Sequence, residues 1–244
     1  MTRICSTTDA NPRKPASCPA TDASLRQPAP CSIKLCGLTR LCDIKAANEL
    51  MPDYIGFVFA PGSRRYVPPQ KAEELKKALA PEIKAVGVFV DEAAETVAAF
   101  LNQGLIDLAQ LHGNEDGEYV RKLRTLTSAP LIQAIRTRTK ADLAAAMLSN
   151  ADYLLLDSGA GTGKTFDWKL IQGFPAEARP CFLAGGLTPD NVGEALRQFS
   201  PYGVDVSSGI ETDGVKDRYK MAAFVAAVRK ETMHTETRYE NDKS

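Results

Sequence analysis

The sequence predicts a single (β/α)8 barrel, the α/β fold known as the TIM barrel, and three observations favour it. From Ser32 onwards, short apolar runs alternate with amphipathic segments, roughly every 20–30 residues. The alternation is strict, which is typical of parallel strands joined by helices. Eight such pairs fit within about 200 residues, and eight parallel strands close into a barrel.

The strands are predicted from apolar runs that are too short to be helices. The clearest is Tyr153-Leu-Leu-Leu156, whose lack of polar alternation indicates burial on both faces of a sheet. It ends on Asp157, a carboxylate that we expect where the strand leaves the core. The eight strands are expected at residues 32–37, 54–59, 84–90, 106–112, 131–136, 153–157, 181–184 and 203–206.

Helices follow the strands, and the spacing of apolar residues supports them. After the first strand, Thr39 is expected to cap a helix whose residues 41, 44, 47 and 50 share one apolar face. A doubly wound open sheet is the competing topology, but it usually carries a glycine-rich phosphate motif after its first strand, and Cys36-Gly37-Leu38 is not one. The helices are expected at residues 39–50, 68–80, 92–103, 115–127, 139–149, 191–199 and 216–232.

Both ends of the chain lie outside the repeat. Residues 1–31 hold five prolines among Ser, Thr and Asp, with no hydrophobic period, and are predicted to be a disordered leader. Arg3, Arg13, Lys14 and Arg26 make the leader mildly basic, so a weak targeting signal is the alternative. Residues 32–232 are expected to form the catalytic barrel, and residues 233–244 a polar, frayed C-terminal tail.

The composition is that of an ordinary globular protein. Of the 244 residues, 44% are hydrophobic and 25% are charged, and 30 basic residues balance 30 acidic ones. This balance argues against a nucleic-acid or anionic-membrane partner. No apolar stretch approaches the roughly 20 residues that span a bilayer. The six cysteines show no C-x-x-C spacing, so we expect neither a zinc site nor a disulfide framework, and a cytoplasmic location.

Chemically reactive residues crowd the carboxyl ends of the predicted strands. In a barrel these ends meet on one face, where barrel enzymes have their active sites. Gly185-Gly186 and Ser207-Ser208-Gly209 follow the seventh and eighth strands, where many barrels bind a phosphate on backbone N–H groups. A phosphorylated substrate is therefore expected. The other strand ends carry Cys36, Arg64 and Arg65, Asp91, His112, Arg136 and Asp157.

Each of these residues also has a purely structural interpretation. Cys36 could be a small buried hydrophobe, and Asp157 could cap the next helix or pair with Lys164. Arg65 could be a solvated loop charge, and His112 a hydrogen-bonded structural histidine. The presence of Cys36 and Asp157 on one face of a barrel favours the catalytic interpretation.

The residues at the strand ends favour proton transfer without a metal or cofactor. No metal cluster, Ser–His–Asp set or dinucleotide motif is found in the sequence. The string Gly161-Thr-Gly-Lys-Thr165 resembles the end of a P-loop, but position 158 is serine where a P-loop needs glycine. What remains is an acid, a thiol and a phosphate cradle. An acid and a thiol on opposite sides of a substrate can move protons between adjacent atoms, which is an isomerisation.

Seven stretches of the chain match, in order, the motifs of one enzyme family. They are Lys34-Leu-Cys36-Gly-Leu-Thr39, Gly56-Phe-Val-Phe-Ala-Pro-Gly-Ser-Arg-Arg65-Tyr-Val67, Val86-Gly-Val-Phe-Val-Asp91, Gln110-Leu-His-Gly113, Leu156-Asp-Ser158 with Gly161-Thr-Gly-Lys-Thr-Phe-Asp-Trp168, Leu183-Ala-Gly-Gly-Leu187 with Asn191-Val192, and Val204-Asp-Val-Ser-Ser-Gly-Ile-Glu211. Through these stretches, which span residues 32–217, the chain resembles the phosphoribosylanthranilate isomerases, the (β/α)8 isomerases of tryptophan biosynthesis.

The resemblance implies an Amadori rearrangement of N-(5-phospho-D-ribosyl)anthranilate to 1-(o-carboxyphenylamino)-1-deoxyribulose 5-phosphate, with no cofactor. It implies that Asp157 is the general acid, which protonates the ring oxygen, and that Cys36 is the general base, which takes the C2 proton. Arg65 would bind the anthranilate carboxylate. The other substrate-binding residues that it implies are Gly185, Gly186, Ser207, Ser208 and Gly209 around the phosphate, with His112 and Asp205 in the wall of the site.

The charge state of the Cys36 thiol and the length of the loop after Asp157 both bear on the implied mechanism. A thiol with its ordinary pKa of about 8.5 is a poor base at neutral pH unless a positive neighbour favours the thiolate. Arg65 and Lys34 are both candidates for that neighbour. The loop that follows Asp157 is short, so closure over the substrate is expected to differ from that in longer-looped members.

Three alternative functions compete with this one. The isomerase of histidine biosynthesis would need paired aspartates at the ends of the first and fifth strands, where this chain has Cys36 and Arg136. Indole-glycerol-phosphate synthase would need a set of lysine and glutamate residues that we do not find. A barrel that only binds a phosphorylated metabolite predicts loss of Cys36 or Asp157, and both are present. Acceptance of a second sugar phosphate, and the choice between monomer and homodimer, stay open.

Overall fold

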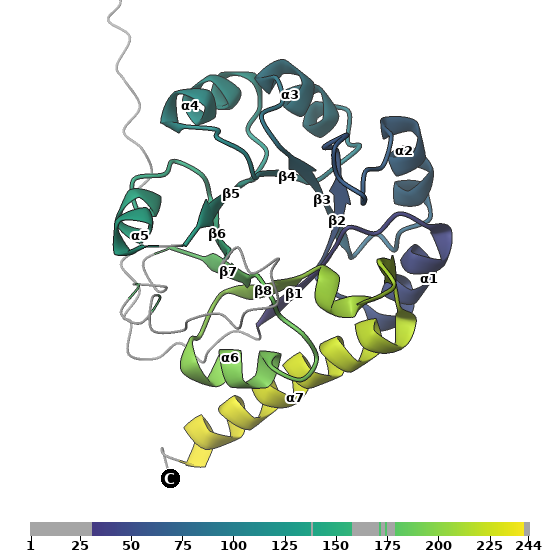
Figure 1. Cartoon of the computed structure of the whole chain (residues 1–244), viewed down its shortest axis with the longest axis vertical. Helices are drawn as coiled ribbons and strands as arrows, with labels where there is room; N and C mark the ends of the chain where they lie inside the picture. The colour runs from purple at the N-terminus through teal and green to yellow at the C-terminus, as the bar shows by residue number, and fades with distance from the viewer. Residues whose placement is uncertain (1–30, 138, 158–170, 172–173, 175–178, 242–244) are drawn as a thin grey trace, which may run out of the picture.

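The computed structural model describes residues 31–137, 139–157, 171, 174 and 179–241 of the chain. Eight parallel strands form a ring, and helices surround the ring on its outside (Figure 1). The strands hydrogen-bond in chain order, and the last pairs in parallel with the first to close the barrel. The predicted (β/α)8 barrel is confirmed.

Each barrel strand begins within two residues of its predicted position. The largest shift is at the fourth strand, which begins at Leu108 instead of residue 106. The observed strands are β1 (Ser32–Cys36), β2 (Tyr54–Val58), β3 (Lys84–Phe89), β4 (Leu108–Leu111), β5 (Leu131–Arg136), β6 (Tyr153–Asp157), β7 (Cys181–Ala184) and β8 (Gly203–Val206).

The helices also match the predicted segments, with differences at their ends. α1 begins after Arg40 and not at Thr39, because Asp43 in its first turn accepts the backbone N–H groups of Thr39 at 3.1 Å and of Arg40 at 2.9 Å. The helices are α1 (Leu41–Leu50), α2 (Pro69–Lys77), α3 (Ala94–Asn102), α4 (Gly117–Leu126), α5 (Lys140–Ala146), α6 (Val192–Gln198) and α7 (Arg218–Asn241).

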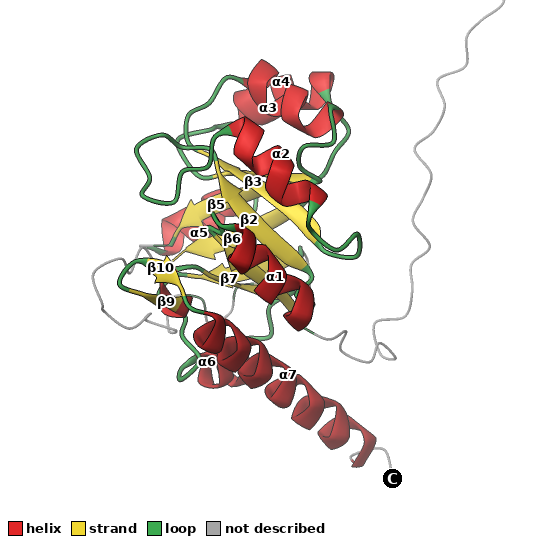
Figure 2. Ribbon diagram, turned by 90° about the vertical axis from the view of Figure 1, so that its right-hand side faces the viewer, coloured by secondary structure: helices red, strands yellow, loops and turns green. Residues whose placement is uncertain are grey.

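The end of the last helix was predicted wrongly. α7 continues to Asn241, beyond residue 232, and projects past the barrel in Figure 2. Residues 233–241 contain no glycine or proline, so a polar sequence there can extend the helix without a break. The leader at 1–30, most of the segment between β6 and β7, and residues 242–244 lie outside the described residues.

A short hairpin after β8 was not predicted. A 3₁₀ turn at Ser208–Ile210 leads into β9 (Glu211–Thr212) and β10 (Val215–Lys216), which pair antiparallel before α7. Within the described part of the chain, none of the helices is long and apolar enough to cross a bilayer.

The two faces of the barrel wall differ in polarity because alternate residues of a strand point to opposite faces. On the outside, apolar side chains such as Leu35, Phe57 and Phe89 belong to a large core shared with the helices. Inside, buried Lys34, Gln110 and Asp205 each lie two residues before a residue at the mouth. The barrel interior therefore grows more polar towards the carboxyl ends of its strands. A smaller apolar cluster closes the interior from below, and it includes Tyr54, Val86, Leu108, Ile132, Leu155 and Phe182.

Candidate active site

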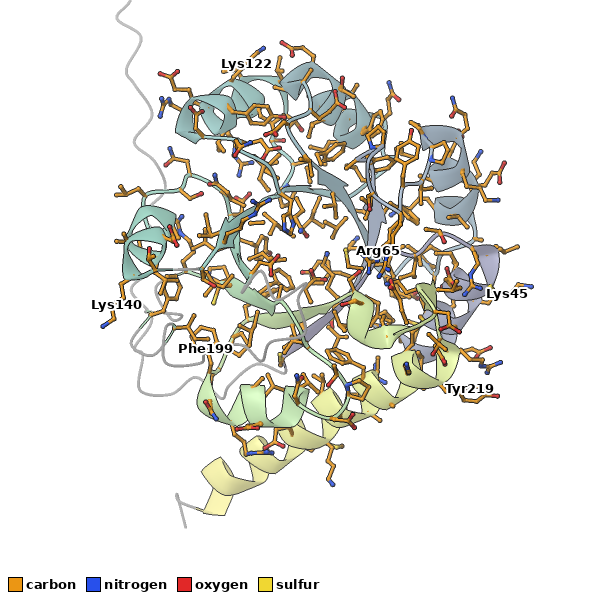
Figure 3. All side chains as sticks on the ribbon, viewed as in Figure 1. Lys45, Arg65, Lys122, Lys140, Phe199 and Tyr219 are labelled. Carbon is orange, nitrogen blue, oxygen red and sulfur yellow. The ribbon has the colours of Figure 1, made fainter. Side chains whose placement is uncertain are left out.

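The carboxyl ends of the strands surround a cavity of about 520 Å³ at the mouth of the barrel. Figure 3 shows Arg65 at the inner edge of the strand ring, facing this mouth. Gly209, predicted for the phosphate, lies one residue beyond the lining. The other nine predicted residues line the cavity: Cys36, Arg65, His112, Asp157, Gly185, Gly186, Asp205, Ser207 and Ser208.

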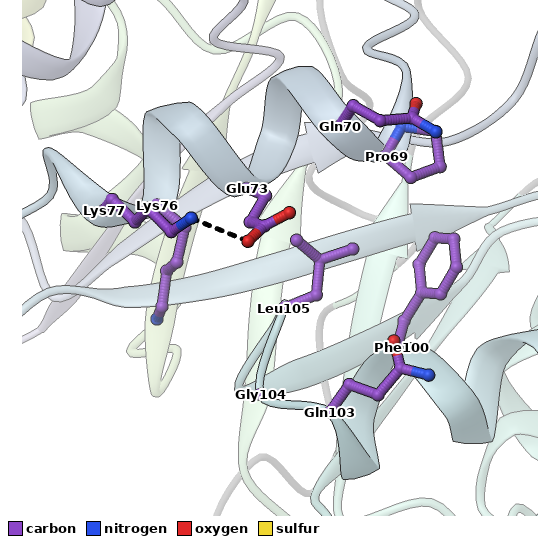
Figure 4. A pocket seen from close by; sticks show the side chains of 9 residues that line it. All are labelled: Pro69, Gln70, Glu73, Lys76, Lys77, Phe100, Gln103, Gly104 and Leu105. Atoms are coloured by element: carbon purple, nitrogen blue, oxygen red, sulfur yellow. Dashed lines mark hydrogen bonds and ion pairs between the residues drawn. The ribbon is translucent and has the colours of Figure 1, made fainter.

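A second hollow lies outside the barrel, between α2 and the end of α3 (Figure 4). An ion pair borders it, with Lys77 Nζ 2.7 Å from Glu73 Oε1, and Phe100 and Leu105 form its apolar part. Its lining includes none of the predicted site residues and no cysteine or histidine. The chemistry expected from the sequence is therefore concentrated at the barrel mouth.

Cys36 ends β1 and is held tightly by its surroundings. Its carbonyl oxygen accepts a hydrogen bond of 3.1 Å from Ser207 Oγ, which ties β1 to the loop after β8. A methyl group at Gly56, its partner on β2, would lie 2.7 Å from the Cys36 sulfur, so glycine leaves the thiol its space. Burial raises the pKa of the Cys36 thiol, and the positive charge of Lys34 acts against this effect.

Asp157, at the end of β6, is held in a row of three polar side chains. His112 Nε2 lies 3.2 Å from Asp157 Oδ2, and Gln110 Nε2 lies 2.8 Å from His112 Nδ1. With the amide nitrogen of Gln110 placed towards Nδ1, a neutral His112 would carry its proton on Nε2 and donate to Asp157. Gln110 is fully buried, and its Oε1 has no hydrogen-bond partner in the described structure. This row fixes the orientation of the Asp157 carboxyl group.

Arg65 is held by Glu211 of the hairpin. Its Nε donates to Glu211 Oε1 at 2.6 Å and its Nη2 donates to Glu211 Oε2 at 2.9 Å, a two-pronged pair. Arg64 and Lys216 contact the same carboxylate at 2.8 and 2.6 Å. Burial alone would raise the pKa of Glu211, but the hydrogen bonds from Arg65 and Lys216 outweigh burial and lower it. The hairpin therefore orients the guanidinium of Arg65 at the edge of the cavity.

The loops after β7 and β8 come together as a cradle. Gly185 and Gly186 have φ angles of 92° and 66°, a left-handed backbone that favours glycine. A methyl group at Gly209 would lie 1.9 Å from the carbonyl oxygen of Leu187, so the two loops are in close backbone contact there. Lys216 Nζ donates a hydrogen bond of 2.9 Å to the carbonyl oxygen of Ser207 and so stabilises the loop after β8.

Asp205 was expected in the wall of the site, and its main partner lies deeper in the barrel. Its Oδ1 accepts a hydrogen bond from Lys34 Nζ at 2.9 Å. The Lys34 side chain has no exposed surface and does not line the cavity. Burial lowers the pKa of Lys34, but Asp205 and Cys36 together outweigh burial and raise it. Lys34 is therefore a buried ammonium with one carboxylate partner.

The sequence does not assign a role to several residues that hold the site in place. Gln110 was detectable, since it stands two residues before His112, a predicted site residue. Lys34, two residues before Cys36, is one of the two cations that the sequence offers as a neighbour of the thiol. Glu211 and Lys216 carried no local signal, because their partners are far away in the sequence.

Comparison with known proteins places the chain in a family. A family model described as N-(5'-phosphoribosyl)anthranilate (PRA) isomerase matches residues 33–227. The N-(5'-phosphoribosyl)anthranilate isomerase of Dechloromonas aromatica is 46% identical over 205 residues, which cover 81% of this chain and 96% of that protein.

Solved structures of the family superimpose on the barrel. A structure of monomers generated from the dimeric phosphoribosylanthranilate isomerase of Thermotoga maritima gives a TM-score of 0.74 at 35% identity. The match covers 82% of this chain and 99% of that chain. A phosphoribosylanthranilate isomerase solved with reduced 1-(o-carboxyphenylamino)-1-deoxyribulose 5-phosphate gives a TM-score of 0.72 at 34% identity, covering 82% and 99%. The chain thus belongs to the phosphoribosylanthranilate isomerase family, the isomerases of tryptophan biosynthesis.

Proposed function

We propose that the cavity at the barrel mouth carries out the reaction of this family with Cys36 as general base and Asp157 as general acid. The reaction is the cofactor-free Amadori rearrangement of N-(5-phospho-D-ribosyl)anthranilate to 1-(o-carboxyphenylamino)-1-deoxyribulose 5-phosphate. One observation carries the proposal: the thiol and the carboxyl group line the same cavity. They stand on β1 and β6, three strands apart around the ring, so they approach a bound substrate from different sides.

Ring opening is assigned to Asp157. Its carboxyl group protonates the oxygen of the furanose ring, the bond from this oxygen to C1 breaks, and the anthranilate nitrogen becomes part of a Schiff base. The proton leaves the carboxyl group, so a carboxylate remains, to which His112 donates a hydrogen bond. This hydrogen bond stabilises the charge that develops on Asp157 in the step.

Proton abstraction is assigned to Cys36. As a thiolate it takes the proton from C2, and the electron pair of the C–H bond moves to form the enolamine, which tautomerises to the ketone product. The glycine at position 56 leaves the sulfur room to reach the substrate. The hydrogen bond from Ser207 to the carbonyl of Cys36 fixes the backbone from which the thiol projects.

The two ends of the substrate are assigned to opposite parts of the cavity. Arg65, held through Nε and Nη2 by Glu211, presents its remaining nitrogen, Nη1, to the anthranilate carboxylate. The phosphate is assigned to Gly186, Ser208 and the other residues of the two closely packed loops. These contacts set the orientation in which C2 faces the thiol and the ring oxygen faces the acid.

The test is a direct assay with freshly prepared N-(5-phospho-D-ribosyl)anthranilate, followed by the loss of anthranilate-type fluorescence. Cys36→Ala and Asp157→Asn are each expected to lower kcat by about 10²–10⁴-fold, the range for removal of a general acid or base. Cys42→Ala on α1 and Asp190→Asn, both exposed positions, are the matched controls and should keep wild-type rates.

Three results would contradict parts of the proposal. Full turnover by Asp157→Asn would mean that another group is the acid. Full turnover by Cys36→Ala would remove the thiol from the mechanism. Tight binding of a reduced product analogue without any turnover by the wild type would make this a binding protein.

The remaining expectations concern partners and location. The proposed partner is the phosphorylated small-molecule substrate, with no nucleic acid and no membrane. The relative from Thermotoga is described as dimeric, and for this chain we retain monomer or homodimer, which light scattering after size-exclusion chromatography distinguishes. A cytoplasmic location remains the expectation from the balanced charge and the pattern of cysteines.

A further inference from the structure

Lys34 is a buried charge that the proposed mechanism does not use. Its side chain has no exposed surface, it does not line the cavity, and it therefore cannot touch a substrate bound there. Its ammonium lies 2.9 Å from Asp205 Oδ1, and the Asp205 side chain is only 9% exposed. The barrel thus contains an ion pair almost entirely removed from water.

Such a pair is poorly explained by stability. Removing two charges from water costs several kcal/mol per ion, and replacement of a buried pair by apolar residues of similar volume is often neutral or stabilising. The layer below it is already an apolar cluster of tyrosine, phenylalanine, leucine, isoleucine and valine. A methionine at position 34 would continue that cluster. The charged pair needs a reason other than packing.

Its position supplies that reason. Lys34 and Cys36 are two residues apart on β1, so both side chains face the barrel interior. Asp205 pairs with Lys34 in strand register on β8. Charged side chains from several elements act on the Cys36 thiol: Lys34 on its own strand, Asp205 on β8, Lys216 of β10, and Arg65 from the loop after β2.

We propose that the buried Lys34–Asp205 pair sets the charge state of the Cys36 thiol, with Lys34 favouring the thiolate and Asp205 limiting this effect. The inference rests on the proposed role of Cys36 as the base. Lys34 does not contact the reacting atoms. It acts on the reaction through its electrostatic effect on Cys36. Asp205 keeps the ammonium beside the sulfur and partly neutralises it.

The electrostatics around the thiol have the required signs. Burial is the largest influence and raises the pKa of Cys36; Lys34 lowers it, Asp205 raises it and Lys216 lowers it. A base that is too acidic is always ionised but weak, and one that is too basic is protonated at neutral pH. A cation balanced by an anion brings the thiol between these extremes.

The two partners therefore predict opposite results. In Lys34→Met the thiolate loses the cation with the largest effect on it, so alkylation of Cys36 by iodoacetamide at pH 7 should slow by about tenfold or more, which corresponds to a rise of one pH unit in its midpoint. In Asp205→Asn the Cys36 thiolate becomes the remaining anionic partner of Lys34, whose pKa Cys36 also raises, so alkylation at the same pH should accelerate. The rates are measured between pH 6 and 10 on the full chain, with mass spectrometry of the peptide that carries Cys36.

The chain provides its own control for unfolding. Cys181 is fully buried on β7, and none of the described cations acts on its thiol, so its alkylation reports opening of the barrel in every variant. A purely structural role of the pair predicts that Cys181 becomes reactive and that both variants shift Cys36 in one direction. That result, or unchanged midpoints in both variants, overturns the proposal. If Lys34→Met does not fold, the isosteric Asp205→Asn alone still decides the sign.

The alkylation assay also separates this inference from the proposed function. It measures the thiol without substrate, so opposite shifts can appear in a protein that does not turn over phosphoribosylanthranilate. Turnover without any shift would instead support the isomerase and refute the role of the pair. With both correct, the pH profile of kcat/KM should move with the alkylation midpoint in each variant.

Discussion

The carboxylate of Glu211 holds together three cations, and its loss should destabilise the protein more than most single substitutions. The Glu211 side chain is 4% exposed and its partner Lys216 is 2% exposed. Arg65 and Arg64, at 2.6 and 2.8 Å, complete the cluster. Glu211→Gln keeps the shape of the side chain and removes only its charge, which leaves the buried Lys216 without a counter-ion.

The magnitude follows from burial. Removal of one partner from a buried ion pair costs about 3–5 kcal/mol, since it leaves an uncompensated charge. Lys216 is the partner that depends more on the pair. Burial is the main influence on the pKa of Lys216 and lowers it even with Glu211 present. Glu211 has three cationic neighbours, and its pKa is lowered, which favours its charged form. For a chain of this size, 3–5 kcal/mol corresponds to a fall in Tm of roughly 6–20 °C.

The assay is urea unfolding followed by circular dichroism at 222 nm, with a double-mutant cycle. Glu211→Gln is compared with Lys216→Met and with the double variant, which removes the stranded charge. We expect the double variant to be more stable than the sum of the single losses predicts, by about 0.5–3 kcal/mol. A loss below 1 kcal/mol in Glu211→Gln, or strict additivity in the cycle, would refute the argument from burial.

Three further predictions follow from the same structure. Gly56→Ala places a methyl group 2.7 Å from the Cys36 sulfur, so kcat/KM should fall by about 10²-fold at nearly unchanged Tm, and wild-type kinetics would contradict this. Phe182→Ala removes a fully buried ring from the apolar cluster in the barrel and should cost about 3–5 kcal/mol in urea unfolding; a loss under 1 kcal/mol would show that the cluster repacks. The pKa of Glu211 is lowered in the fold, so its contribution to stability is present above its unfolded pKa of about 4.3 and is lost as the pH falls through the folded pKa. The difference in unfolding free energy between wild type and Glu211→Gln should therefore shrink below about pH 4. A constant difference from about pH 7 to about pH 3 would contradict this prediction.

The fold was predictable because its signals are local. In β6, three consecutive leucines indicate burial on both faces of the sheet, and the repeat of strand and helix indicates the topology. The site was predictable to the same extent, since parallel strands bring Cys36, His112 and Asp157 to one rim wherever the helices lie.

The ion pairs around the site were not predictable, because charge pairing depends on distance in space. Lys34 and Asp205 are 171 residues apart in the sequence, and Arg65 and Glu211 are 146 apart. The sequence around Arg65 does not show whether its guanidinium is solvated or paired with Glu211. The end of α7 was predicted wrongly for another reason: the sequence after residue 232 is polar and gives no apolar period from which the end of the helix can be located.

The barrel closes along the seam between β1 and β8, and this seam runs through the cavity. Across it, Ser207 bonds to Cys36, and Asp205 bonds to Lys34. The first strand is synthesised early and its partners are synthesised near the end of the chain. A nascent or truncated chain that lacks β8 would hold the thiol and the acid but neither the Asp205 counter-charge nor the cradle loop. Activity should therefore appear in a single step, when β8 pairs with β1 and closes the barrel. A ribosome-bound or partly folded chain should show no partial activity before that step.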